Sequence, residues 1–228
     1  MFKGLIDLIF PEICTSCQTS LLDKEEVICT ACRHDLPLCN WKDFQNNLVS
    51  EKLKGRIKLS YADALFYFEK GNKAQSLLHE LKYKNQEQIS AYLGRWHGEN
   101  LKHLRWTKNI DIIIPVPIHS KRRRERGYNQ VTDYAKTISQ KIGCEYSDNI
   151  LKRKYYSKTK TQVFKSRKSR TDVIEHNFVL NNSEEIRGKH IALVDDLITT
   201  GATAEACFLQ LSKSQDIKLS LIVMAVAV

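Results

Sequence analysis

The sequence predicts an α/β fold, a parallel sheet flanked by helices, with a small cysteine-rich module in front of it. Several strand-length segments are almost entirely apolar, as in "IDIIIPVPI" at 110–118 and "LSLIVMAVAV" at 219–228. Segments with the apolar spacing of helices alternate with them. This alternation is typical of a parallel sheet that is buried on both faces. Two C-x-x-C pairs set the first 40 residues apart from the rest.

The first 40 residues are predicted to form a small metal-binding module. Cys14 and Cys17 form one C-x-x-C pair, and Cys29 and Cys32 form the second. Two such pairs supply four thiolates with the spacing of a structural, tetrahedral zinc site. A segment this short buries little apolar surface, so we expect metal binding to supply its folding energy. An iron–sulfur cluster or a redox dithiol is the weaker alternative, and four filled positions argue against a catalytic zinc.

We expect a cytoplasmic protein without a membrane span. No segment approaches the ~20 apolar residues that cross a bilayer. The start of the chain is too short and too acidic for a secretory signal, and no small-residue cleavage site follows it. Its apolar residues Phe2, Leu5, Ile6, Ile9 and Phe10 share one face of a short amphipathic turn. In the cytoplasm thiols stay reduced, so the cysteines need an explanation other than disulfides.

We divide the chain into a zinc-ribbon-like module at 1–40, a polar connector at 41–60 and one α/β domain at 61–228. The spacing of apolar residues predicts the elements of this domain in order. They are a strand in "ADALFYFEKGN" that ends at the turn 71–72, helices at 73–82 and 89–104, a strand at 110–118, a helix at 131–142, a strand at 190–196, a helix to about 213 and a strand at 219–228. Ligands of such sheets bind beyond the carboxyl ends of the strands.

Positive charge is concentrated between His119 and Asp172. This stretch has sixteen Lys and Arg against five Asp and Glu, a net charge of +11, where the whole chain carries +10. A basic surface confined to one region indicates phosphate, either in a small ligand or in a nucleic acid. A solvated basic face without a ligand is the alternative.

The stretch "HIALVDDLITTGATAEA" at 190–206 combines an apolar strand, two acids and several threonines around a glycine. A loop from a strand into a helix presents backbone amides and the positive end of the helix dipole, which together seat a phosphate. Gly201 permits close approach of the backbone. Asp195 and Asp196 would repel a phosphate, but they can accept hydrogen bonds from a sugar diol or hold a divalent cation through water. The pattern therefore predicts a ribose 5-phosphate site.

This segment resembles the loop of type I phosphoribosyltransferases that binds phosphoribosyl pyrophosphate (PRPP). Four apolar residues, two acids and a threonine–glycine cradle follow one another in "IALVDDLITTGAT", as they do in that family. No G-x-x-x-x-G-K-[ST] and no G-x-G-x-x-G occurs in the sequence to support another nucleotide site. The resemblance implies a type I phosphoribosyltransferase-like parallel sheet flanked by helices.

The chain also resembles one branch of that family, the ComF proteins (ComFC and GntX-like proteins), which carry a four-cysteine module ahead of this domain. Three further segments are similar to their motifs: "LKYKNQ" at 81–86, "PVPIHSKRRRERGYNQ" at 115–130 and "TKTQVFKSRKSR" at 159–170. The chain departs from the family in one place, because no Asn stands in register after the last arginine of the third segment.

The resemblance implies a role for each matched residue. Asp195 and Asp196 would bind the ribose hydroxyls and form the catalytic pair. The 5-phosphate would lie in the cradle of Thr199, Thr200, Gly201, Ala202 and Thr203. The pyrophosphate and its Mg²⁺ would lie beside His119, Arg126 and Gly127, because guanidinium groups suit a leaving diphosphate. Arg122, Arg123 and Arg124 stay open between this role and a solvated or nucleic-acid-binding face.

The segment 152–172 carries nine basic residues, with Tyr155, Tyr156 and Phe164 among them. The resemblance implies a flexible lid that folds over the substrate and excludes water, with Thr159 and Gln162 as its matched residues. Basic residues interleaved with aromatic ones equally suit single-stranded nucleic acid. A disordered loop is the third interpretation.

The sequence thus predicts a PRPP-binding, phosphoribosyltransferase-like protein of ComF type that acts in DNA uptake during natural transformation, a role that the resemblance alone implies. The expected cofactors are structural Zn²⁺ and the Mg²⁺ that accompanies PRPP. The expected partners are PRPP, single-stranded DNA and competence proteins of DNA uptake. A non-enzymatic protein that binds single-stranded DNA and a PRPP sensor are the alternatives. The sequence leaves the acceptor, the catalytic activity and the oligomeric state open.

Overall fold

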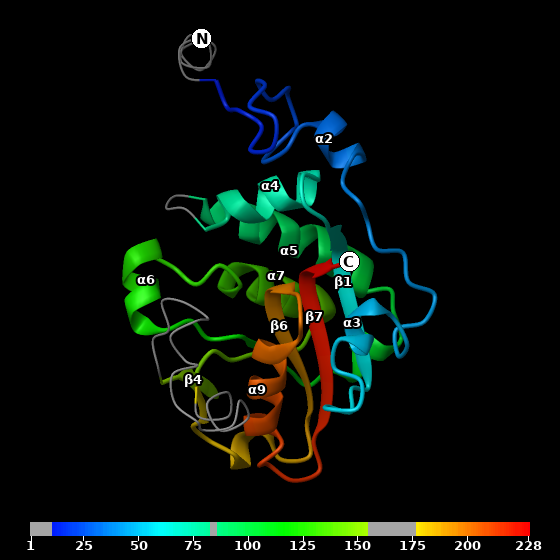
Figure 1. Ribbon diagram of the computed structural model, residues 1–228, viewed down its shortest axis with the longest axis vertical. Coiled ribbons are helices and arrows are strands. Elements are labelled where there is room, and N and C mark those ends of the chain that lie inside the picture. The colour runs from blue at the N-terminus through cyan, green and yellow to red at the C-terminus, as the bar shows by residue number, and fades with distance from the viewer. Residues whose placement is uncertain (1–10, 83–85, 155–176) are drawn as a thin grey trace.

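A computed structural model describes the protein over residues 11–82, 86–154 and 177–228. Its main sheet has five strands in the order β1-β7-β6-β2-β3, and every neighbouring pair is parallel. The strands are β1 (Tyr61–Phe68), β2 (Ile112–Pro115), β3 (Glu145–Tyr146), β6 (His190–Ile198) and β7 (Lys218–Ala227). Figure 1 shows β6 and β7 side by side at the centre. The predicted parallel α/β fold is confirmed.

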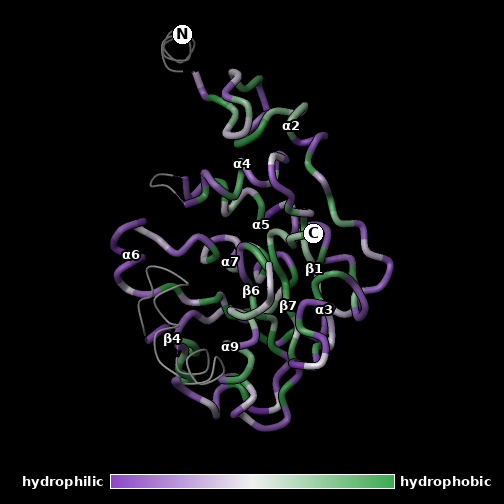
Figure 2. Tube along the Cα trace, viewed as in Figure 1, coloured by the Kyte–Doolittle hydropathy of each residue, from purple (hydrophilic) through white to green (hydrophobic). Residues whose placement is uncertain are grey.

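Both faces of the sheet are covered, because successive residues of a strand point to opposite sides. In β6, Ala192 and Val194 join one apolar cluster, whereas Ile191 and Leu193 join the other. All four side chains are fully buried. A strand buried on both faces requires the uninterrupted apolar runs that the sequence shows. Figure 2 shows hydrophilic residues in the peripheral helix α6 (Ser120–Arg126), which buries none of its residues.

Three helices contribute to the apolar cluster on the first face of the sheet. They are α4 (Lys73–Glu80), α5 (Glu87–Leu101) and α7 (Thr132–Ile142). The side chain of Asn72 caps α4 by accepting a 3.0 Å hydrogen bond from the Gln75 amide. α5 and α7 pack against each other through apolar residues at helical spacing, such as Leu93, Tyr134 and Ile138. These helices agree with the predicted segments to within a few residues.

The second face is covered by α3 (Leu48–Glu51) and α9 (Ala202–Leu211). α9 buries Phe208 and Leu211, as the predicted helix after β6 should. α3 lies inside the segment 41–60, where the sequence predicts a polar connector. Val49 and Leu53 of this segment are fully buried against the sheet.

Several short elements have no counterpart in the predicted order. They include α2 (Thr30–His34), the strand β3, the 3-10 helices η1 (Trp106–Asn109) and η3 (Glu184–Ile186), and an antiparallel pair of β4 (Leu151–Arg153) with β5 (Phe178–Leu180). The strand predicted at 110–118 is shorter than expected. Its pairing ends with the hydrogen bond from the Val116 amide to Val194 O, because Pro117 has no amide proton to donate.

The sequence also predicts an amphipathic turn at the start of the chain and no membrane-spanning segment. The amphipathic turn from Phe2 to Phe10 lies outside the described residues. Among the helices that are described, none combines the length and the hydropathy that a membrane span requires.

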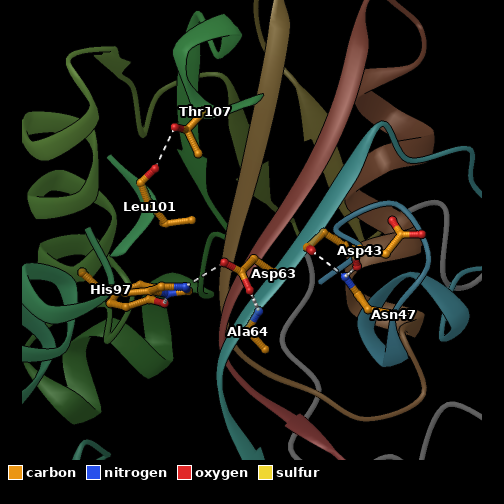
Figure 3. A network of polar contacts seen from close by, with 9 residues as sticks. Asp43, Asn47, Asp63, Ala64, His97, Leu101 and Thr107 are labelled. Atoms are coloured by element: carbon orange, nitrogen blue, oxygen red, sulfur yellow. Dashed lines mark hydrogen bonds and ion pairs between the residues drawn. The ribbon is translucent and has the colours of Figure 1, made fainter. Parts of the chain in front are cut away.

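A polar network in the interior joins β1 to α5 and α7. His97 Nε2 in α5 lies 3.3 Å from Asp63 Oδ2 in β1 (Figure 3). The other ring nitrogen, Nδ1, is hydrogen-bonded to the hydroxyl of Tyr134 in α7. Asp63 Oδ1 also accepts a 2.8 Å hydrogen bond from the Ala64 amide. All three side chains are buried, so each depends on the others for its hydrogen bonds.

Candidate functional site

The structure brings the two predicted phosphate motifs to one edge of the sheet. β2 and β6 are parallel neighbours, in which Pro115 pairs with Val194. The chain leaves β2 for α7 on one face and leaves β6 for α9 on the other. Neighbouring strands whose connections run to opposite faces form a topological switch point, where open α/β sheets bind ligands beyond the strand ends. Residues 116–127 and 199–203 lie at this point.

The loop between β6 and α9 has the geometry of an anion seat. Gly201 is the N-cap of α9, and its φ of +80° is in the left-handed region that favours glycine. No side chain of the described residues caps this helix, so its first amides and the positive end of its dipole face the loop. Thr199, Thr200 and Thr203 are exposed there. Their hydroxyls and the helix amides are donors suited to a phosphate.

The two acids lie within β6, whereas the sequence placed them at its end. β6 continues to Ile198, which pairs with Val226 of β7. Asp195 and Asp196 are half-buried, and the Asp196 amide donates a 2.9 Å hydrogen bond to Asp195 Oδ1. Burial, and next the neighbouring Asp196 carboxylate, raise the pKa of Asp195 well above its usual value. Such a pair favours a ligand that donates hydrogen bonds or brings positive charge.

The arginines of α6 divide into two sets. Arg122 and Arg126 stand four residues apart, on one face of the helix, and are half-buried. Arg123 and Arg124 are exposed. Burial lowers the pKa of Arg126, and the like charge of Arg122 lowers it further. A guanidinium group keeps its charge in spite of such a shift.

Arg126 and Arg153 each interact with one carboxylate of the acid pair. The negative charge of Asp196 raises the pKa of Arg126 and so partly offsets the lowering, which means that these two side chains interact. Arg153, at the end of β4, has its pKa lowered by burial and by Arg122, while Asp195 opposes the change. The Nε atom of Arg153 is buried and has no hydrogen-bond partner among the described residues. The structure thus places three guanidinium groups near two carboxylates. Arg153 matches none of the family motifs, and only its membership of the basic segment 152–172 could have singled it out.

The loop after β2 is held in place by its own matched residues. His119 is the N-cap of α6, and its Nδ1 accepts a 3.1 Å hydrogen bond from the Lys121 amide. Gly127 ends the helix with a φ of +87°, which allows the tight turn that the sequence predicts. The Asn129 amide group donates a 3.1 Å hydrogen bond to Val116 O at the end of β2.

Tyr128 connects this loop to the segment 81–86. Its hydroxyl donates to the carbonyl of Leu81, at the end of α4, so two of the quoted motifs lie side by side. Burial, and next the Glu87 carboxylate, raise the pKa of Tyr128 to about 12, which keeps the hydroxyl protonated as a donor. Tyr83 of the same segment lies outside the described residues.

The two matched residues of the expected lid, Thr159 and Gln162, also lie outside the described residues. The structure describes the chain on either side of them. The Lys154 amide donates a 2.8 Å hydrogen bond to Asn177 O, and β4 pairs with β5 just before it. Lys154 and Asn177, the described residues that flank 155–176, are therefore joined to each other next to Arg153.

The four cysteines of the N-terminal module form one cluster. Their Sγ atoms all lie within 4.8 Å of one another. Cys17 Sγ and Cys29 Sγ are 3.7 Å apart, close to the ~3.8 Å edge of a tetrahedron with metal–sulfur bonds of ~2.3 Å. Backbone amides point at the sulfurs, since the Cys29 amide donates to Cys14 Sγ at 3.3 Å. The cluster could hold a metal ion, as the spacing predicts.

The cysteines of this cluster differ in how readily they become thiolates without a metal ion. Hydrogen bonds from the Thr19 hydroxyl and amide lower the pKa of Cys17 to about 6. Burial raises the pKa of Cys32 to about 12. A bound cation would stabilise the Cys32 thiolate that the protein alone disfavours. The donor set therefore fits a thiolate-binding metal.

The cysteine module packs against α5. The guanidinium carbon of Arg33 lies 4.7 Å from the ring centroid of Trp96, and Arg95 forms an ion pair with Glu26. Val27, Ile28 and Cys32 of the module belong to the apolar cluster of the first sheet face. In Figure 1 the module lies above α4 and α5.

The fold and the sites define a class: α/β proteins with a parallel sheet, a threonine–glycine loop at its switch point and an N-terminal four-cysteine module. DNA utilization protein YhgH of Shigella flexneri is 31% identical over 130 residues, and competence protein F of Haemophilus influenzae is 34% identical over 131 residues. Each match covers 56% of this chain and 56% of the relative. Competence protein ComFC of Bacillus subtilis is 24% identical over 217 residues, 86% of this chain and 84% of that one.

The chain thus spans little more than half of the length of the YhgH and competence protein F relatives. Homologues that carry the ComF names confirm the resemblance that the motifs indicate. No family model matches the chain.

Solved structures that resemble the chain include an adenine phosphoribosyltransferase. It is 15% identical with a TM-score of 0.37, and the match covers 61% of this chain and 69% of that one. An allosteric regulatory enzyme of purine biosynthesis is 15% identical with a TM-score of 0.43, over 63% of this chain and 30% of that one.

Proposed function

We propose that the chain is a PRPP-binding, phosphoribosyltransferase-like protein of ComF type. One observation carries the proposal: an acid pair, an uncapped helix start and a set of arginines meet at the switch point between β2 and β6. PRPP carries a phosphate, a sugar diol and a diphosphate within one small molecule. Each of these groups has a chemically matched partner at this edge of the sheet.

Each part of the proposed site has its own task. The cradle from Thr199 to Thr203 seats the 5-phosphate through amides and hydroxyls. Asp195 and Asp196 accept hydrogen bonds from the two ribose hydroxyls and orient the ring. Arg122, Arg126 and Arg153 neutralise the diphosphate, with the turn at Gly127 beside them. Mg²⁺ bound with PRPP would supply further charge neutralisation to the diphosphate oxygens.

Phosphoribosyl transfer is the reaction that this arrangement supports. The bond between ribose C1 and the diphosphate oxygen breaks, and the electron pair leaves with the pyrophosphate. A nitrogen of the acceptor forms the new bond to C1 and gives up its proton. The chain then needs no nucleophile of its own, because positioning and neutralisation of the leaving charge lower the barrier.

The cysteine cluster is assigned to structural zinc. Four thiolates fill a tetrahedron and leave no open position for substrate. The module then serves to complete the apolar cluster against α5. Reduced thiols at ligand spacing agree with a cytoplasmic location.

We assign the biological role to DNA uptake, supported by the names of the homologues, with single-stranded DNA and competence proteins as partners. Binding of single-stranded DNA is the second candidate function, with PRPP as a regulatory ligand that the protein senses. The exposure of Arg123 and Arg124 on α6 favours it, because exposed guanidinium groups can contact the phosphates of a nucleic acid.

Two assays separate these functions. A DNA-binding protein should lose affinity for a labelled single-stranded oligonucleotide steeply with salt, in proportion to the phosphates that it contacts. A transferase should release pyrophosphate from Mg-PRPP only when a particular acceptor base is present. Pyrophosphate release with no acceptor dependence, or none with any base, would contradict the transferase assignment and leave PRPP as a bound effector.

A further inference from the structure

The segment before β1 is attached to the sheet and to the phosphate cradle at once. Asn47 Nδ2 donates a 2.8 Å hydrogen bond to Ala62 O in β1, while Asn47 Oδ1 accepts from the amides of Val49 and Ser50 and so caps α3. Leu53 is fully buried one turn further on. The segment is therefore fixed by packing and hydrogen bonds where it meets the cradle.

This contact with the cradle is close. A Cβ atom on Gly201 would lie 2.8 Å from Lys52 O and 3.0 Å from Leu53 Cδ2. Glycine is thus required at 201 for close approach as well as for its left-handed backbone. The phosphate loop is supported from behind by the residues that precede β1.

Arg56 connects the two segments through one guanidinium group. Its Nη2 donates a 2.8 Å hydrogen bond to Thr200 O in the cradle and a second one to Lys52 O in its own segment. Its Nη1 forms an ion pair with the Glu205 carboxylate in the first turn of α9. Glu205 is in turn fixed to the loop, since its amide donates a 2.8 Å hydrogen bond to Gly201 O.

The ion pair between Arg56 and Glu205 affects how well the cradle can bind an anion, because Glu205 is itself negatively charged. A carboxylate in the first turn of a helix is stabilised by the dipole, and it competes there with an anionic ligand for the same positive potential. The Glu205 side chain is mostly buried, at 18% exposure, so solvent screens its charge only in part. Arg56 cancels that charge beside the cradle.

We propose that Arg56 is a positioning residue for the phosphate cradle. It holds the Thr200 carbonyl in place and neutralises Glu205, and through both it raises the affinity for a sugar phosphate. This inference rests on the proposed function of the cradle.

Four variants of the chain test the proposal by calorimetric titration with ribose 5-phosphate. Arg56→Ala should weaken binding about tenfold, the worth of a lost charge-assisted contact. Glu205→Gln should bind as tightly as the wild type or more tightly. The double variant Arg56→Ala with Glu205→Gln should recover part of the lost affinity, because the unpaired carboxylate is gone. Arg56→Lys should lie between wild type and Arg56→Ala.

Arg95→Ala is the matched control, because Arg95 in α5 also forms an ion pair with a glutamate, Glu26. It should bind ribose 5-phosphate as the wild type does. Arg56→Ala with unchanged affinity would overturn the proposal, and so would a double variant no better than Arg56→Ala. No binding of ribose 5-phosphate or PRPP to the wild type would instead contradict the proposed function itself.

Discussion

His97 in α5 and Asp63 in β1 lie 3.3 Å apart in the interior, where Tyr134 completes their network from α7. Removing one partner leaves a buried polar group without a hydrogen bond. We expect Asp63→Leu to lower the free energy of unfolding by about 2–4 kcal/mol, since His97 loses its acceptor. Urea unfolding measures this loss. Asp216→Asn, at an exposed position, is the control and should change little. Equal stability of Asp63→Leu and wild type would show that the network contributes nothing.

The raised pKa of Asp195 links the candidate site to stability. Between the unfolded pKa of about 3.9 and the higher folded pKa, the folded chain holds a proton that the unfolded chain has released. The stabilising contribution of this proton is complete at low pH and is lost as the pH rises through the folded pKa.

Asp195→Asn should therefore be more stable than the wild type at about pH 8, by about 1 kcal/mol, and little different at about pH 4. Urea unfolding of both proteins at several pH values measures the difference. Glu185→Gln, in an exposed acidic turn, serves as the control without this trend. An Asp195→Asn advantage that grows as the pH falls would contradict the assigned direction.

The two faces of α6 make a paired prediction. Arg122→Ala should weaken PRPP binding about tenfold, because Arg122 lies on the face shared with Arg126. Affinity for ribose 5-phosphate, which lacks the diphosphate, should stay unchanged. Arg123→Ala on the exposed face is the control for both ligands. Equal losses from the two substitutions would mean that α6 acts only through its net charge.

The cysteine cluster predicts one zinc ion per chain. Cys14→Ser with Cys17→Ser should lower the zinc content to none, as measured by elemental analysis, and should lower Tm. The module then loses the metal that supplies its folding energy. Cys144→Ser, outside the cluster, should keep both zinc and Tm. One zinc per chain in the double variant would show that other residues are the ligands.

The sequence predicts those parts of the site that are contiguous in the chain. The acids, the cradle and the four cysteines each form a short sequence pattern, and the residue types in that pattern indicate its chemistry before the fold is known. The roles of Arg153 and Arg56 could not be predicted from the sequence. Each interacts with a residue that is distant in the chain, Asp195 for Arg153 and Glu205 for Arg56. The division of α6 into two faces could have been predicted from the spacing of Arg122 and Arg126. The β4–β5 pair could not, since two three-residue strands carry no periodic signal.

Calorimetric titration with PRPP and Mg²⁺ tests the central claim most directly, on the wild type and on Asp195→Asn with Asp196→Asn. The two acids are only half-buried, so the double variant should fold as the wild type does. We expect the wild type to bind PRPP and the double variant to bind none that the titration detects. Equal PRPP affinity of the two folded proteins would contradict the assignment of the site.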